Sequence, residues 1–448
     1  MVNIMRVEKW PRILAHADIN AAYASIACLE DRSLRGKRVA VSGDPASRSG
    51  LVLAASPEAK KFGVRTGQPL WEARQRCPDL VFVCIHDLGR KTIRRVSDDF
   101  VEMCYAITPQ LALEGDDGVY LDMTGCVRDF EEAEAKAHGL RLRMQYEIGV
   151  TISVGVSFNR NFAKLASDYR KPNQCTVISH DNWKDIVWPL PVSDLYWIGP
   201  ATTGKLNRMG ITTIGQLAAA NLDFIFDRLG VIGRMLWHFA NGQDTTTIAY
   251  KDDRPEAKTI GNSTTAIKDM ETLDDILRHA VKLCEITSEN LRKDNLLCTG
   301  LKVGLRSTDL SWIGRQKVLP FPSRTCRMFY DQANLLIQKH WNGEPLRGIE
   351  VRATGLIGDD YLQMALLPEM LKDQDNERID TAIQNIHRRM GSGMIVRGRV
   401  YEDSFIYSEG TVILFCLNEI LRLSVLGHAG GEQSIHIGYK QLLAVQHL

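Results

Sequence analysis

The first 160 residues alternate between short apolar segments and segments with helical periodicity. The apolar segments predict strands at 13–19, 37–42, 51–55, 81–85, 119–123 and 150–157. The segments between them predict helices at 20–29, 57–63, 69–76, 91–107 and 129–148. Ser56 and Pro57 give the second of these helices an N-cap and a proline at its first position. This mixed order of strands and helices predicts an α/β or α+β first domain.

A second α/β unit is predicted after a polar linker at Asp244–Ala257. Its expected strands and helices are, in chain order, 258–266, 273–293, 297–305, 316–319, 323–341 and 348–356. Before the linker, residues 191–242 are expected to form short helices punctuated by glycines. The late apolar run TVILFCLNEILRLSVL is compatible with a helix, but the sequence does not indicate where such a helix would pack in either unit.

Composition sets broad limits on the class of protein. The 448 residues are 44% hydrophobic and 24% charged, which is ordinary for globular proteins. No apolar run reaches the ~20 residues of a membrane-spanning helix. The first 20 residues lack the features of a signal peptide, so we expect the cytoplasm. The ten cysteines include no CxxC pair, which argues against a zinc ribbon and favours reduced, packed thiols.

Net charge is only +1, but one segment is locally basic. Between Leu301 and Arg352 there are nine cations and four anions: Lys302, Arg306, Arg315, Lys317, Arg324, Arg327, Lys339, Arg347 and Arg352 against Asp309, Asp331, Glu344 and Glu350. Such a segment either faces phosphates or is an ordinary solvated face, and the sequence leaves both open.

The stretch DLYWIGPATTGKLNRMGITTIGQLAAA resembles a helix-hairpin-helix module. Such hairpins point backbone N–H groups at a phosphate without reading bases. We therefore expect Gly199 and Thr202 to contact DNA, with a purely structural helical turn as the alternative.

Three aspartates stand at places where a sheet could bring them together. Asp18 ends the first apolar segment, and Asp116 and Asp117 precede the strand at 119–123. Neighbouring residues of a strand point to opposite faces, so only one of Asp116 and Asp117 is expected to share a face with Asp18. Carboxylates at strand ends can hold two Mg²⁺ ions for nucleotidyl transfer. A helix cap and a solvated turn are the plain alternatives.

A family resemblance connects these features. The runs HADINAAYASIACLEDRSLRGKRVAVSGDP, LVLAASPEAKKFGVRTGQPLWEARQRCPDL, GVYLDMTG and ISVGVSFNRNFAKLASDYRKPNQCTVI resemble Y-family, translesion DNA polymerases of the bacterial DNA polymerase IV-like branch. KTIGNSTTAI, RQKVLPFP and GIEVRATGL resemble that family's little-finger domain. The resemblance covers roughly residues 12 to 402.

The resemblance implies an α+β multidomain fold shaped as a right hand. It places the palm at 11–20 and 88–176, the fingers at 21–87, and a thumb with the helix-hairpin-helix at 177–245. A linker at 246–256 leads to an α/β little finger at 257–402, and the role of 403–448 is left open. In the little finger, Arg315 and Lys317 are the expected DNA contacts.

The resemblance also implies roles for single residues. Asp18, the carbonyl of Ile19 and Asp117 match metal ligands, and two Mg²⁺ ions are expected. Tyr23 matches the steric gate that favours deoxynucleotides. Lys164 matches the lysine that neutralises the incoming triphosphate.

Two departures from the family pattern put turnover in doubt. The family's acidic pair falls on Asp117 and Gly118, so a glutamate is missing, and Asp116 is the candidate replacement. The family's triphosphate-contacting Tyr and Arg fall on Pro57 and Lys60, and a lysine offers a point charge in place of a bidentate fork. Losing one such group typically costs about 10²–10³ in rate.

Two functions follow from these observations, and a third is weaker. The first is an active translesion polymerase in DNA repair, a monomer that binds primer–template DNA and deoxynucleoside triphosphates and no membrane. The second is a non-catalytic relative that binds DNA and recruits other factors. The third, a helix-hairpin-helix nuclease, leaves Tyr23 and Lys164 unexplained. KQLLAVQHL, with Gln441, loosely resembles a sliding-clamp peptide, and an ordinary amphipathic tail is the alternative.

Overall fold

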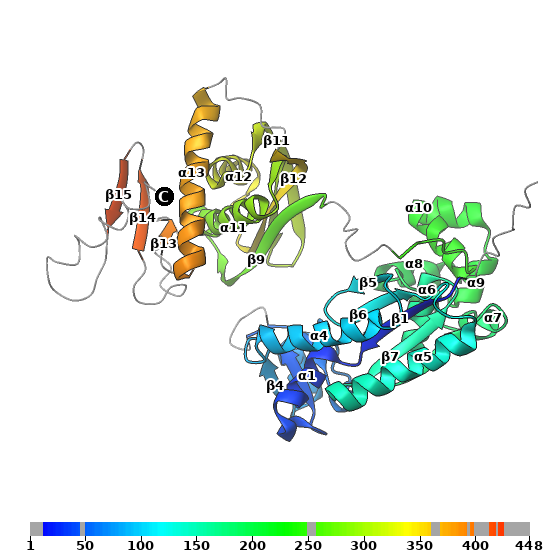
Figure 1. Ribbon diagram of the computed structural model, residues 1–448. Coiled ribbons are helices and arrows are strands. Elements are labelled where there is room, and N and C mark those ends of the chain that lie inside the picture. The colour runs from blue at the N-terminus through cyan, green and yellow to red at the C-terminus, as the bar shows by residue number, and fades with distance from the viewer. Residues whose placement is uncertain are drawn as a thin grey trace, which may run out of the picture. The chain divides into compact units, whose positions relative to one another are not determined.

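The computed structural model describes residues 12–44, 50–248, 257–359, 368–391, 395–397, 412–417 and 420–424. The chain divides into two compact units, Met1–Pro255 and Glu256–Leu448 (Figure 1). Each unit is described by itself below.

A five-stranded sheet lies at the centre of the first unit. Its order is β5 (Leu111–Glu114), β6 (Gly118–Asp122), β1 (Leu14–Ile19), β7 (Ile152–Ser157) and β8 (Cys175–Ile178). β1 runs antiparallel to both of its neighbours, and β8 runs parallel to β7. The predicted strands at 13–19, 119–123 and 150–157 are confirmed within two residues at either end, whereas β5 was not predicted.

The two faces of this sheet are covered differently. One face carries the main core, which α4 (Arg90–Tyr105) and α5 (Phe130–Arg143) complete, followed by a π-helical turn at Met144–Ile148 (Figure 1). On the other face lies α6 (Arg160–Tyr169). α6 can approach closely because β7 has Gly155 there: a Cβ on Gly155 would stand 2.2 Å from the Ala163 carbonyl oxygen.

A smaller sheet of order β3-β2-β4 follows β1 in the chain. Its strands are Val52–Ala55, Val39–Ser42 and Val81–Cys84, and the helices nearby in sequence are α1 (Ala22–Glu30), α2 (Pro57–Lys60) and α3 (Leu70–Arg76). The predicted cap is confirmed, since the Ser56 side chain accepts a hydrogen bond from the Ala59 N–H. Two small apolar cores hold this region together.

Short helices complete the first unit. They are α7 (Trp183–Val187), α8 (Pro200–Arg208), α9 (Ile214–Ala219) and α10 (Leu222–Ala240), with a 3₁₀ turn at Val192–Asp194. Gly230, with φ 66°, breaks α10 internally. These helices share a core with α6.

The second unit contains a four-stranded antiparallel sheet of order β11-β10-β12-β9. The strands are Trp312–Ser323, Leu296–Ser307, Leu346–Gly358 and Thr259–Met270. α11 (Leu273–Lys293) and α12 (Cys326–His340) pack on one face, where Leu301, Val303 and Leu305 of β10 enter the core. The prediction of a second α/β unit is confirmed.

The last elements differ from the expectation. α13 (Pro368–Met390), which was not predicted, packs on α12. Within TVILFCLNEILRLSVL the structure has strands β14 (Val412–Leu417) and β15 (Ile420–Ser424), paired with each other and with β13 (Ile395–Arg397). The helical interpretation of that run was therefore wrong: an unbroken apolar run has no periodicity that separates a helix from a buried strand. No helix in the described part of the chain is long and apolar enough to cross a membrane.

Candidate active site

Two aspartates meet at the end of the palm-like sheet. Asp18 is the fifth residue of β1 and pairs in register with Gly118, the first residue of β6. Asp117 precedes β6, and its carbonyl oxygen accepts a hydrogen bond of 2.9 Å from the Ile19 N–H. Burial and the neighbouring charge of Asp18 raise the pKa of Asp117. The two carboxylates thus repel each other, and a cation between them would be stabilised.

Lys171 supplies a cation to this pair from the loop after α6. Its ammonium contacts the carboxylate of Asp18 and lies 2.6 Å from Asp168 Oδ1. Burial alone would lower the pKa of Lys171, but the charges of Asp18 and Asp168 outweigh it and raise that pKa. Lys171 was not predicted as a site residue, because nothing local in the sequence shows that the chain returns here to the end of β1.

Asp116 points elsewhere. The Tyr23 hydroxyl donates to Asp116 Oδ2 at 3.2 Å, and Tyr23 is a half-buried residue of α1. Among the residues that the structure describes, no three His, Cys, Asp or Glu side chains stand together in an arrangement that could hold a metal ion. The pair Asp18 and Asp117 therefore fits a cation, but Asp116 does not complete a three-carboxylate cluster in this arrangement.

A second polar cluster lies on the same face of the sheet, around Glu114. Glu114 Oε2 lies 2.9 Å from the Lys164 ammonium and 3.0 Å from His16 Nε2. Glu114 Oε1 accepts a hydrogen bond of 2.9 Å from the Tyr196 hydroxyl. Burial alone would raise the pKa of Glu114, but its hydrogen bonds with His16 and Lys164 outweigh that effect and hold the pKa well below its usual range.

His16 connects this cluster to the aspartates along β1. It lies two residues before Asp18, so both side chains belong to the α6 face. The ring is fully buried, its Nδ1 lies 2.8 Å from the Ser167 hydroxyl, and burial lowers the pKa of His16. Neither His16 nor Glu114 was predicted as a site residue, although the two-residue spacing between His16 and Asp18 was a usable signal for the histidine.

Position 118 has no room for a side chain. Gly118 pairs with Glu114 across the β5–β6 ladder. A Cβ on Gly118 would stand 2.9 Å from the Glu114 carbonyl oxygen, 3.2 Å from the Glu114 Cβ and 3.4 Å from His16 Nε2. Glu114 and His16 thus fill the space that a side chain at 118 would enter.

Comparison with known proteins identifies the family. The impB/mucB/samB family matches residues 17–168, its helix-hairpin-helix motif matches 180–211, and its C-terminal domain matches 257–366. DNA polymerase IV of Acetivibrio thermocellus is 36% identical over 396 residues, which are 88% of this chain and 98% of that protein. DNA polymerase IV of Clostridium acetobutylicum is 33% identical over 399 residues, 87% of this chain and 98% of that protein. The chain belongs to the Y family of DNA polymerases.

Solved structures support the same fold. A Y-family DNA polymerase chimera built on Dbh has a TM-score of 0.67 at 21% identity, covering 77% of this chain and 99% of that one. DinB from Sulfolobus solfataricus has a TM-score of 0.51 at 22% identity with the same coverage. The right-hand arrangement of palm, fingers, helix-hairpin-helix thumb and little finger is confirmed as the fold class, and the chain is a DNA-directed DNA polymerase of the translesion type.

Other predicted site residues of this polymerase lie in the fingers and the thumb. Lys60 is exposed at the last residue of α2. Gly199 is the N-cap of α8. Because glycine has no side chain that could accept a hydrogen bond, no N-cap side chain satisfies the first N–H groups of this helix. Thr202 lies in the first turn of α8 and is half-buried. The DNA-binding roles of Gly199 and Thr202 and the nucleotide-binding role of Lys60 stay predictions.

The basic segment of the little finger is divided between two faces of the sheet. Arg315 and Lys317 of β11 are exposed and stand opposite the core residues Val303 and Leu301, so they belong to the helix-side face of this edge strand. Lys302, Arg306 and Arg352 belong to the open face. The sequence alone could not separate the two sets, because the face of each residue depends on the strand register.

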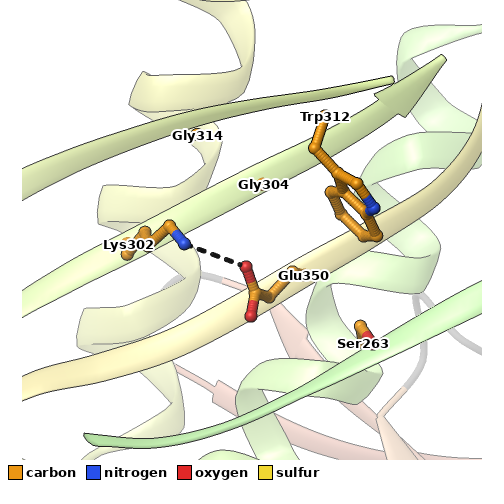
Figure 2. Close-up of a pocket in the computed structure, with 6 residues that line it drawn as sticks. All are labelled: Ser263, Lys302, Gly304, Trp312, Gly314 and Glu350. Carbon is orange, nitrogen blue, oxygen red and sulfur yellow. Dashed lines mark ion pairs between the residues drawn. The ribbon is translucent and has the colours of Figure 1, made fainter. Parts of the chain in front are cut away.

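The open face also has a shallow pocket of about 270 Å³, lined by Ser263, Lys302, Gly304, Trp312, Gly314 and Glu350. Figure 2 shows the Lys302 ammonium directed at the Glu350 carboxylate, 3.3 Å away, with the Trp312 ring across the pocket. Gly304 leaves the base of this pocket free of a side chain, since a Cβ there would lie 3.2 Å from the Trp312 ring. This face therefore offers a flat aromatic ring beside cations.

Proposed function

We propose that this polymerase adds deoxynucleotides to a primer 3′-end in translesion synthesis, with Asp18 and Asp117 as the metal ligands of its active site. The observation that carries the proposal is the adjacent carboxylate pair at the end of β1, in which burial and Asp18 raise the pKa of Asp117. Lys171 offsets only part of the negative charge of this pair. Bound Mg²⁺ would offset the rest, and would lower the pKa of the primer 3′-hydroxyl and stabilise the leaving oxygens.

The ammonium groups beside the carboxylates have a separate role. The Lys171 ammonium forms an ion pair with Asp18, and the Lys164 ammonium forms one with Glu114. A triphosphate bound next to the aspartates would bring several negative charges, which these lysines can neutralise. Lys171 is the better placed of the two, because it already stands at a proposed metal ligand.

Tyr23 is proposed to select the sugar. The hydrogen bond from its hydroxyl to Asp116 restricts the direction of the ring. A ring fixed near the nucleotide would crowd a ribose 2′-hydroxyl, which favours deoxynucleotides. Asp116 then acts through Tyr23, and its role as a metal ligand and the backbone role of Ile19 stay predictions.

DNA is proposed to contact the thumb and the little finger through phosphates. The uncapped start of α8 can donate backbone N–H groups to a phosphate. Arg315 and Lys317 on one face of the little-finger sheet, and Lys302, Arg306 and Arg352 on the other, provide cations. A solved ternary complex of the related Dbh polymerase supports this proposal for DNA and nucleotide together.

Several further expectations stay predictions. They are the count of two Mg²⁺ ions, the monomeric state, a cytoplasmic location, a part in DNA repair and the domain boundaries. The clamp-like peptide with Gln441 lies outside the described residues. The non-catalytic accessory function has no observation in its favour.

The proposal is tested by primer extension with purified full-length chain, Mg²⁺ and an undamaged or an abasic template. We expect extension by the wild type and none above background by Asp18→Ala. Equal extension by the two proteins would remove Asp18 from the mechanism. No extension by a wild type that still binds primer–template would favour the non-catalytic alternative.

A further inference from the structure

Glu114 stands opposite a glycine at the edge of the active site. It ends β5, pairs with Gly118, and sends its carboxylate over the α6 face of the sheet, where Asp18 and His16 also point. Its side chain is 25% exposed, and its two oxygens contact groups from four other elements: β1, β6, α6 and the segment before α8. Position 114 was not among the residues predicted to form the site.

Lys164 stands close to the aspartates on the α6 face of the sheet. Its ammonium lies 3.4 Å from His16 Nε2, and the same ring nitrogen would lie 3.4 Å from a Cβ on Gly118, the residue after Asp117. Its ion pair, however, is with Glu114, and only 18% of its side chain is exposed. A flexible four-carbon stem would let the ammonium move toward Asp117 if Glu114 lost its charge.

We propose that Glu114 is a positioning residue that holds the Lys164 ammonium away from Asp117, so that the Asp117 carboxylate stays open to a divalent cation. This inference rests on the proposed function for what the aspartates bind. Lys171 already occupies Asp18, and a second ammonium on Asp117 would neutralise the pair and compete with the cation. Glycine at 118 is part of the same arrangement, because a side chain there would collide with Glu114.

The test is cation affinity, measured with Mn²⁺ on the full-length chain without nucleotide, by the electron paramagnetic resonance signal of free Mn²⁺. Glu114→Gln keeps the shape of the side chain and removes its charge. We expect the Kd for Mn²⁺ to rise about tenfold, the scale of one strong charged contact. Glu132→Gln on α5 is the matched control, since Glu132 is also a glutamate in an ion pair, with Arg128, and we expect no change.

A second substitution separates positioning from a general structural role. In Glu114→Gln with Lys164→Met the competing ammonium is absent, so we expect the Kd for Mn²⁺ to return to within about twofold of wild type. A purely structural role of Glu114 would not be rescued in this way. An unchanged Kd in Glu114→Gln, or a double variant no better than the single one, would overturn the proposal.

Lys164→Met alone covers the case in which Glu114→Gln does not fold. It removes the restrained cation and leaves Glu114 with its contacts to His16 and Tyr196, so Mn²⁺ should bind as well as in wild type or better. A tenfold loss of affinity in this variant would contradict the proposal. Primer extension by the wild type, run in parallel, tests the proposed function separately, because Mn²⁺ affinity can follow the expected order even in a chain that extends no primer.

Discussion

Two groups of carboxylates in this polymerase have opposite surroundings. In the palm, Asp18 and Asp117 lie side by side, and burial and mutual repulsion raise the pKa of Asp117. In the little finger, the fully buried Asp380 of α13 accepts hydrogen bonds from the Cys326 N–H, the Ser288 hydroxyl and Arg292, at 2.8, 3.3 and 3.3 Å, and pairs with Arg397. A carboxylate with many donors fastens one helix to others, whereas a pair with few donors is suited to an added cation.

The largest effect is expected from a substitution in the palm pair, Asp18 and Asp117. Asp18→Asn removes one of the two negative charges and keeps the volume of the side chain. We expect primer extension to fall by about 10²–10³ or more, as for other losses of one transition-state-stabilising group. The free energy of unfolding should change little, because the loss of the ion pair with Lys171 is offset by the loss of the repulsion from Asp117. Steady-state extension rates and urea unfolding check the two statements, and a clear loss of stability would show that the pair is structural.

The same substitution in the little finger should have the opposite outcome. Asp380→Asn leaves Arg292 and Arg397 without their shared buried partner, and such losses typically cost about 3–5 kcal/mol. Hydrogen exchange followed by mass spectrometry should show faster exchange in α11, α12 and α13, with the palm sheet unaffected. Unchanged protection of these helices would mean that Asp380 does not hold α13 in place.

A third experiment tests the space around position 118. Gly118→Glu restores the acid expected from the family, but its Cβ would meet the Glu114 backbone at 2.9 Å. We expect the single variant to lose about 1–3 kcal/mol of stability, in the range of overpacked sites, without a gain in extension.

The matched variant is Gly118→Glu with Glu114→Ala. Alanine removes the Glu114 carboxylate but keeps the carbonyl oxygen and the Cβ that stand nearest to position 118. This double variant should therefore be no more stable than Gly118→Glu alone and should not extend primers faster. Thermal unfolding and extension rates of the four proteins in the cycle measure the coupling. A recovery of stability in the double variant would contradict a clash with the Glu114 backbone.

The smallest expected effect is a pH dependence at Asp244, a well-partnered carboxylate of the first unit. Burial alone would raise its pKa, but hydrogen bonds from Thr246 and Asn161 lower it. A lowered folded-state pKa stabilises the fold above the unfolded-state pKa of about 4, and this contribution is lost as the pH falls further. We therefore expect the stability gap between wild type and Asp244→Asn to shrink between pH 7 and pH 3. A gap that does not change with pH would refute this.

Much of the fold follows from local patterns. The strand that carries Asp18 and the Ser56 cap were predictable, because the burial of a strand and the capping of a helix both depend on residues a few positions apart. β5 was not, because Leu111–Glu114 is too short and too irregular in polarity to stand out. The strands at 412–417 and 420–424 show the same limit, since a continuous apolar run fits a buried strand as well as a helix.

The order of the residues was enough to identify the family, to predict the pair Asp18 and Asp117, and to notice the missing acid at Gly118. Each of these three conclusions depends on short motifs, and the residues of a short motif can be recognised in the sequence without knowing the fold. Only the tertiary structure decided what surrounds the pair: Lys171 on Asp18, Asp116 against Tyr23, and Glu114 opposite Gly118 with Lys164 and His16. Lys171 and Glu114 are 153 and 98 positions from their partners Asp18 and His16, and sheet register and the close approach of α6 at Gly155 bring such groups together.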